Sequence, residues 1–225
     1  MIGIPNMAAM AALIADPVRA AMLYALMDGS ARHSSDLAEI AGASPQAASN
    51  HLAKLLDGGL LKVKQSGRHR LYALRGPAVA HVLEALMAAS GSPEARGHRI
   101  DPALKQARRC YDHLAGSAGV AVLKALVSGG YLAADLDGYQ MTAKGRDWFE
   151  GVGVDVAAAE NATRTFARPC MDWTERRSHL AGSLGAELLT ALTEQGCVRA
   201  MEIPRALAIT PKGREFLRKS LGITA

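Results

Sequence analysis

The C-terminal half of the chain contains the same pattern twice, which limits the folds open to it. HLAGSAGVAVLKAL at residues 113–126 recurs as HLAGSLGAELLTAL at residues 179–192, and MTAKGRDWF at 141–149 recurs as ITPKGREFL at 209–217. Such self-similarity indicates two copies of one structural unit that bury their apolar faces against each other. We expect pseudo-twofold repeats over residues 102–151 and 164–222, each folding as two helices, a short hairpin and a helix.

The composition favours a mainly helical protein. The 225 residues are 49% hydrophobic, enough for a sizeable core, but only 4% aromatic, and abundant Ala, Leu and Met favour helices over sheets. Three widely spaced cysteines do not indicate a disulfide framework, so we expect a reducing compartment. The apolar N-terminus lacks a basic flank and is interrupted by Asp16 and Arg19. Neither secretion nor a membrane partner is therefore indicated, and the expected location is cytoplasmic.

The first 90 residues contain start signals for several helices. Asp16-Pro17, SSDLAE and Ser44-Pro45 are each typical of a helix start, and Pro77 begins a further helix. The stretch LLKVKQSGRHRLYAL places β-branched and aromatic residues on both sides of Ser-Gly, the signal of a β-hairpin. We expect helices over residues 17–28, 35–40, 45–57 and 77–89, with the hairpin before the last of them.

Positive charge is concentrated in residues 44–76. This segment has six basic residues and one acid, which accounts for the whole formal charge of +5 in a chain with 26 basic and 21 acidic residues. A focused basic segment suits a polyanion, and charge alone is equally compatible with an ordinary solvated surface.

The helix over residues 45–57 has one apolar and one polar face. Ala48, Leu52, Leu55 and Leu56 fall together when successive residues are turned by about 100°. The opposite face carries amides and small side chains, which allow close approach to base edges in a DNA groove. With the hairpin tip, it supplies the predicted DNA-binding residues: Ser44, Gln46, Ser49, Asn50, Lys54, Lys64, Arg68, His69 and Arg70.

The order helix, helix, turn, helix, basic hairpin, helix is that of a winged helix-turn-helix domain. Residues 44–74, SPQAASNHLAKLLDGGLLKVKQSGRHRLYAL, resemble the recognition helix and wing of the ArsR-type bacterial repressors, and the resemblance covers roughly residues 10–90. It implies a homodimer, paired through the first and last helices of the domain, on a palindromic DNA operator. We expect this domain over residues 1–92, a linker over 93–101 and a duplicated, mostly helical domain with short β-hairpins over 102–225.

The metal sites common in that family are incomplete here. The stretch that holds cysteine ligands in the family reads SARHSSDL, with serines and no thiol. A second common site joins an Asp-x-His on the wing strand to a His-x-x-Glu on the following helix. This chain keeps His81 and Glu84 but has Arg68 and Arg70 on the strand. Two ligands beside two cations make a poor zinc site, so we assign no metal residues and favour a structural or dimer-interface role for His81.

Each repeat opens with a cysteine in a similar setting. Cys110 in RRCYDHLAG and Cys170 in RPCMDWTERRSHLAG both lie within two residues of an arginine and two residues before an aspartate. Nearby arginines would favour thiolates, the reactive and metal-binding form. We therefore predict an effector or redox site at Cys110, Cys170, His113 and His179, with both cysteines on helices. The alternative, that the cysteines are small buried core residues, is equally open.

We interpret the chain as a DNA-binding transcription regulator, with a repressor's role implied by the resemblance, that is modulated through its C-terminal domain. It is expected not to be an enzyme, because no nucleophile elbow, phosphate loop or metal-hydrolase motif occurs. The alternatives are a thiol-dependent enzyme built on the repeated Cys, His and Asp, and an architectural DNA-binding protein without an effector. The cofactor is unknown, and a metal ion, an oxidant or a small molecule are all open as the effector.

Overall fold

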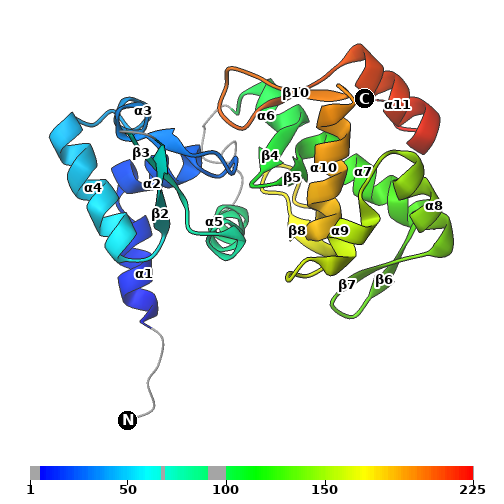
Figure 1. The fold of residues 1–225 in the computed structure, drawn as a ribbon, viewed down its shortest axis with the longest axis horizontal. Coiled ribbons are helices and arrows are strands. Elements are labelled where there is room, and N and C mark those ends of the chain that lie inside the picture. Colours follow the sequence, from blue (N-terminus) through cyan, green and yellow to red (C-terminus); the bar gives the residue numbers. More distant parts are fainter. Residues whose placement is uncertain (1–5, 67–68, 91–99, 225) are drawn as a thin grey trace, which may run out of the picture. The chain divides into compact units, whose positions relative to one another are not determined.

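A computed structural model describes residues 6–66, 69–90 and 100–224. Contacts divide the chain into two compact units, one that ends at Leu83 and one that begins at Glu84. Both units consist mainly of helices with short β-strands (Figure 1). Most of the linker predicted over residues 93–101 lies outside the described residues.

The first unit has the element order of a winged helix-turn-helix domain, as predicted. Its strands form an antiparallel sheet in the order β1-β3-β2. The elements are α1 (Met7–Ile14), α2 (Pro17–Ala25), β1 (Arg32–His33), α3 (Ser34–Ile40), α4 (Pro45–Asp57), β2 (Leu61–Ser66), β3 (His69–Leu74) and the first part of α5 (Pro77–Ala89).

Two of the predicted helix starts, at Asp16-Pro17 and Ser44-Pro45, are confirmed by their caps. The Arg19 N–H donates to Asp16 Oδ1 at 3.0 Å, and the Ala47 N–H donates to Ser44 Oγ at 3.2 Å, so each side chain satisfies an amide that has no partner within its helix. Helix α2 ends earlier than predicted, because the Leu26 N–H donates to the carbonyl of Leu23, three residues back, which tightens the last turn.

Apolar residues from α2, α3, α4 and the wing strands fill the core of the first unit. Within the described residues, no single helix is long and apolar enough to cross a membrane. Helices α1 and α2 together reach that length and composition, but they are bent by 84°. The side chains that α2 buries belong to the core, which includes Met22, Leu23, Leu26, Leu37, Leu52, Leu55 and Leu74.

The second unit contains two copies of one element order. Each repeat consists of a hairpin, a long helix, a second hairpin and a further helix. The elements are α6 (Pro102–Gln106), β4 (Arg108–Cys110), β5 (His113–Ala115), α7 (Gly116–Ser128), β6 (Leu132–Asp135), β7 (Gly138–Met141), α8 (Ala143–Gly151), α9 (Val156–Asn161), β8 (Arg168–Met171), β9 (Ser178–Ala181), α10 (Ser183–Glu194), β10 (Val198–Ala200), β11 (Leu207–Ile209) and α11 (Pro211–Leu221).

The prediction that the cysteines lie on helices is wrong. Cys110 ends strand β4 and pairs with His113 on β5, while Cys170 on β8 pairs with His179 on β9. The chain reverses at Tyr111 in the first hairpin, with φ of 61°, and passes through Arg176 in the second, with φ of 56°. A left-handed residue cannot continue a right-handed helix, so both segments form hairpins.

The two repeats pack reciprocally. Helix α7 of the first repeat lies against β9 of the second, and α10 of the second lies against β5 of the first (Figure 1). A glycine of each helix faces the histidine of the other repeat. A Cβ on Gly119 would lie 3.4 Å from His179 Cβ, and a Cβ on Gly185 would lie 3.4 Å from His113 Cβ. The leucines behind them, including Leu114, Leu126, Leu180 and Leu192, belong to one core shared by both repeats.

Replacement of Gly119 by alanine is expected to destabilise the second unit. The added Cβ would lie 2.4 Å from the Leu114 carbonyl oxygen, and overpacking of this kind costs about 1–3 kcal/mol of unfolding free energy. Gly151→Ala is the control, because a Cβ there meets nothing within 4 Å. Urea denaturation followed by tryptophan fluorescence measures the effect, since both tryptophans, Trp148 and Trp173, belong to the second unit. Equal midpoints for the two variants would contradict the packing argument.

Candidate functional site

Helix α4 presents a polar face suited to a DNA groove. Its apolar side buries Ala48, Leu52 and Leu55 in the core. Small side chains separate the amides and the lysine on the other side, so the backbone can approach a base edge closely. The exposed residues on that side are Gln46, Ser49, Asn50, Ala53 and Lys54.

The wing lies next in the chain. Strands β2 and β3 pair from Leu61↔Leu74 to Ser66↔His69, which places the predicted turn at the distal end. Lys64 and Arg70 are exposed. Arg68 and the side chain of His69 lie outside the described part of the chain. Ser44 is exposed, and its hydroxyl caps α4, so any DNA contact that it makes has to share that oxygen with the Ala47 amide.

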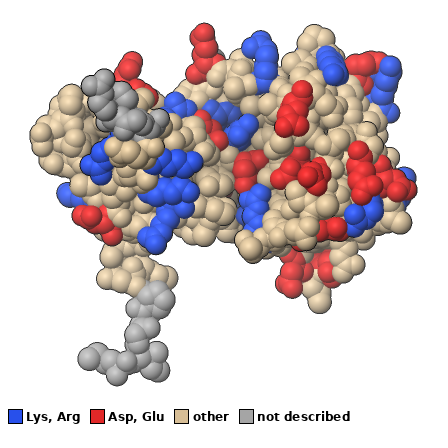
Figure 2. Space-filling view, in the orientation of Figure 1, with Lys and Arg blue, Asp and Glu red and all other residues tan. Residues whose placement is uncertain are grey.

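Basic side chains gather on the first unit. Figure 2 shows several lysines and arginines side by side there, whereas acidic and basic side chains alternate over the second unit. The basic residues contributed by α4 and the wing include Lys54, Lys62, Lys64 and Arg70, all exposed. Such a patch attracts phosphates and raises the rate of association with DNA.

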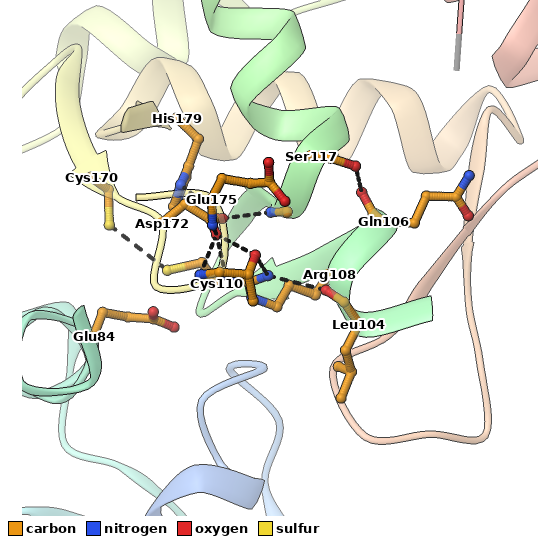
Figure 3. Close-up of polar contacts among 12 residues, drawn as sticks. Glu84, Leu104, Gln106, Arg108, Cys110, Ser117, Cys170, Asp172, Glu175 and His179 are labelled. Atoms are coloured by element: carbon orange, nitrogen blue, oxygen red, sulfur yellow. Dashed lines mark hydrogen bonds and ion pairs between the residues drawn. The ribbon is translucent and has the colours of Figure 1, made fainter. Parts of the chain in front are cut away.

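A second candidate site lies at the two cysteine hairpins of the second unit. The structure brings together the four residues predicted there. The two sulfurs and one nitrogen from each imidazole lie within 4.8 Å of one another, and the two Sγ atoms are 3.9 Å apart (Figure 3). The four side chains, Cys110, His113, Cys170 and His179, are each at most 4% exposed. Cys197 is buried elsewhere, in the apolar core.

Each histidine of this Cys/His cluster has an aspartate beside it. His113 Nδ1 lies 2.9 Å from Asp112 Oδ1, and the ring nitrogen is the donor because an ionised carboxylate can only accept. His179 Nδ1 lies 3.5 Å from Asp172 Oδ2. Burial raises the pKa of Asp112, but His113 and then Arg164 lower it more, and the net direction is down.

Asp172 is itself held by many partners. The Arg108 guanidinium forms an ion pair with it at 2.8 Å, and the Gly116 amide donates to Oδ2 at 2.7 Å (Figure 3). Burial raises the pKa of this carboxyl, but the Arg108 charge and the Thr174 hydroxyl outweigh that effect and hold the pKa well below its usual range. The aspartate of one repeat thus anchors to the arginine and the helix start of the other.

Three buried ring nitrogens of the Cys/His cluster make no hydrogen bond of good geometry within the described residues. They are Nε2 of His113 and both ring nitrogens of His179. The two rings lie 5.1 Å apart, centroid to centroid. Buried polar atoms are normally satisfied, so an unpartnered set of this kind in one place requires an explanation.

The surroundings shift the pKa values of the two cysteines in opposite directions. Hydrogen bonding from the Cys110 thiol, opposed by burial and aided by both histidines, lowers the pKa of Cys170. Burial, together with the neighbouring Cys170, raises the pKa of Cys110 well above its usual range. The expectation that flanking arginines lower both values is therefore wrong for Cys110. Arg108 is neutralised by Asp172, and the groups that act on Cys170 are the other thiol and the two imidazoles.

Comparison with known proteins gives the family. A helix-turn-helix domain family matches residues 14–64. The chain is also 38% identical, over 223 residues, to the uncharacterized HTH-type transcriptional regulator YdfF of Bacillus subtilis (strain 168), which covers 97% of this chain and 98% of that protein. The chain belongs to the ArsR-type family of helix-turn-helix transcriptional regulators. It is a DNA-binding regulator.

Solved structures are similar to part of this ArsR-type regulator. NolR from Sinorhizobium fredii is 26% identical and covers 37% of this chain and 82% of its own, with a TM-score of 0.35. The cadmium metal-sensor CMTR from Mycobacterium tuberculosis is 34% identical and covers 35% of this chain and 78% of its own, with a TM-score of 0.30. TM-scores of this size carry no structural argument for this chain.

The positions that commonly hold metal ligands in the ArsR-type family are occupied here by residues with other surroundings. Ser34 and Ser35 begin α3. His81 is exposed on α5. Glu84, on the same helix, is buried and forms an ion pair with Arg205. The potential ligands of this regulator lie instead in the duplicated unit, and the repeated Cys-x-Asp pattern was the sequence signal for them. The partner arginines, Arg108 for Asp172 and Arg164 for Asp112, have no such local signal.

Removal of Arg108 is expected to destabilise the second unit strongly. Arg108→Ala leaves the Asp172 carboxylate buried without its cation, and breaking a buried pair costs about 3–5 kcal/mol of unfolding free energy. Arg218→Ala is the control, because its ion pair with Glu215 is exposed and solvent and salt screen the attraction between the two charges. Urea midpoints of the two variants give the comparison, and a similar small loss in both would show that the buried pair does not hold the site.

Proposed function

We propose that this ArsR-type regulator binds a palindromic operator as a homodimer, represses the adjacent genes and changes its DNA affinity through its C-terminal unit. The exposed face of α4 carries the proposal. Its amides and small side chains are free of core contacts, and the wing that follows adds exposed cations. Amides discriminate bases in the major groove, and cations bind phosphates without regard to sequence. This role places the protein in the cytoplasm, with the DNA.

The two parts of the surface have different tasks in this proposal. Asn50, at the middle of the exposed face of α4, reads a base, and Lys64 on β2 binds a phosphate. Asn50→Ala is expected to relax selectivity at one base position by about 1–3 kcal/mol, whereas Lys64→Ala weakens binding to all sequences and reduces the salt slope by about one. Fluorescence anisotropy on duplexes selected from a random library measures the base selectivity and the salt slope of each variant.

Lys124→Ala is the matched control for charge, because Lys124 is exposed on α7 of the second unit. Its operator affinity and salt slope should equal those of the wild type. If Asn50→Ala and Lys64→Ala show the same profile across sequences and salt concentrations, the division between base reading and phosphate binding is wrong.

Exposed apolar side chains on α1 and α5 support the homodimer. Helix α1 has no buried residue, and Met7 is 77% exposed. On α5, Val82 and Leu86 are 46% and 48% exposed. Exposed apolar side chains on a helix are typical of a surface that a partner covers, and a twofold dimer covers the same surface on both copies. These are the helices through which the family resemblance implies pairing.

Charge on this surface is expected to separate the two chains. The wild type should have the mass of a dimer by light scattering at micromolar concentration, and Val82→Glu should have the mass of a monomer with weaker operator binding. Leu136→Glu is the control, because Leu136 is 99% exposed on the second unit, far along the chain from α1 and α5. A wild-type monomer, or an unchanged dimer in Val82→Glu, would remove α5 from the interface.

The C-terminal unit has a route to the dimer helices through α5. The division between the two units falls inside this helix, so Val82 belongs to one unit and Glu84 to the other. Glu84 is held by Arg205 within the second unit. A change in that unit therefore acts on a helix that carries part of the proposed dimer surface. The burial of both sulfurs of the Cys/His cluster works against the alternative of a thiol enzyme, whose nucleophile has to meet a substrate.

A further inference from the structure

We propose that the Cys/His cluster is a closed, four-ligand site for a thiophilic divalent metal ion of the zinc class, which joins the two repeats. Cys110 and His113 come from the first repeat, and Cys170 and His179 from the second. Two cysteines and two histidines are one of the ligand sets of structural zinc sites. The inference concerns the second unit alone and does not depend on operator binding.

The distances fit a tetrahedral ion. Zinc–sulfur bonds of about 2.3 Å at tetrahedral angles place two sulfurs about 3.8 Å apart, and the Sγ atoms of Cys110 and Cys170 are 3.9 Å apart. All four donor atoms lie within 4.8 Å of one another. The longest separation involves a histidine nitrogen and exceeds the corresponding tetrahedral edge of about 3.3–3.6 Å by about 1.2–1.5 Å, a difference that side-chain rotation closes.

The surroundings also fit. A metal-bound histidine usually donates its other ring nitrogen to a carboxylate, which fixes the tautomer. Asp112 accepts from His113 Nδ1, so the lone pair of His113 is on Nε2, one of the unpartnered buried nitrogens. Asp172 lies at His179 Nδ1, so Nε2 is likewise the ring nitrogen of His179 that remains for a metal ion. A metal ion satisfies both nitrogens, for which the described part of the chain supplies no hydrogen bond of good geometry.

The composition of the cluster selects the class of ion. Two thiolates and two imidazoles exclude hard cations such as magnesium and calcium, which take oxygen ligands. Four protein ligands leave no open position for water or substrate, so the ion is structural rather than catalytic. Because each repeat supplies only two ligands, the ion binds well only when the repeats are packed together. Its binding free energy therefore stabilises the assembled unit.

Metal binding by the purified full-length chain tests the proposal. Equilibrium dialysis against zinc is expected to give one tightly bound ion per chain. Cobalt is expected to give the visible bands of a tetrahedral ion with thiolate charge transfer. Cys110→Ser and Cys170→Ser should each lose this ion and the cobalt bands. Cys197→Ser should keep both, because this third buried cysteine lies outside the Cys/His cluster. No bound zinc in the wild type, or equal loss in Cys197→Ser, would overturn the site.

Two further measurements cover the case in which the serine variants do not fold. X-ray absorption of the zinc-loaded wild type should show two sulfurs at about 2.3 Å and two nitrogens at about 2.0–2.1 Å. Fewer than two sulfurs would overturn the proposal. Asp112→Asn keeps all four ligands but removes the carboxylate that orients His113, and should weaken zinc binding by about 10–100-fold. Unchanged affinity in a folded Asp112→Asn would remove Asp112 as a positioning residue and the geometric argument with it.

Discussion

The close approach of each repeat's long helix to the other repeat's cysteine hairpin determines the arrangement of the second unit. Gly119 and Gly185 let each long helix pack closely on the hairpin of its own repeat, because a Cβ there would lie 2.4 Å and 2.6 Å from the carbonyl oxygens of Leu114 and Leu180. The same glycines bring the helices up to the Cβ atoms of the two histidines. The same two glycines therefore take part both in the packing within each repeat and in the contact between the repeats.

Buried charge then makes the arrangement specific. A wholly buried arginine and aspartate contribute little net stability compared with apolar residues, because both have to be removed from water. The Arg108–Asp172 ion pair also fixes positions. Asp172 accepts a hydrogen bond from the Gly116 amide at the start of α7 and lies beside His179. One carboxylate thus sets the strand, the helix start and the imidazole relative to one another. The position of His179 in the cluster depends on charges from both repeats.

Local signals predicted the first unit well. The capping side chains Asp16 and Ser44 act within a few residues of the chain, and the strands of the wing are adjacent in sequence, so their effect can be inferred from short stretches. The cysteine segments were predicted as helices because they are short and their strand partners leave little periodic pattern. The left-handed turns at Tyr111 and Arg176 decide those hairpins. The repeat indicated which residues would meet, but the pairings of Arg108 and Arg164 arise only from tertiary packing.

Duplication also explains why the Cys/His cluster has two ligands of each kind. A single repeat holds one thiol and one imidazole, which is too few for a closed zinc site. A tetrahedron has a twofold axis that exchanges its vertices in pairs, so two repeats related by a pseudo-twofold axis can place cysteine opposite cysteine and histidine opposite histidine. The orienting aspartates follow the same relation, with Asp112 at His113 and Asp172 at His179. A site of this symmetry forms only where the two repeats face each other, and the four donor groups come two from each repeat.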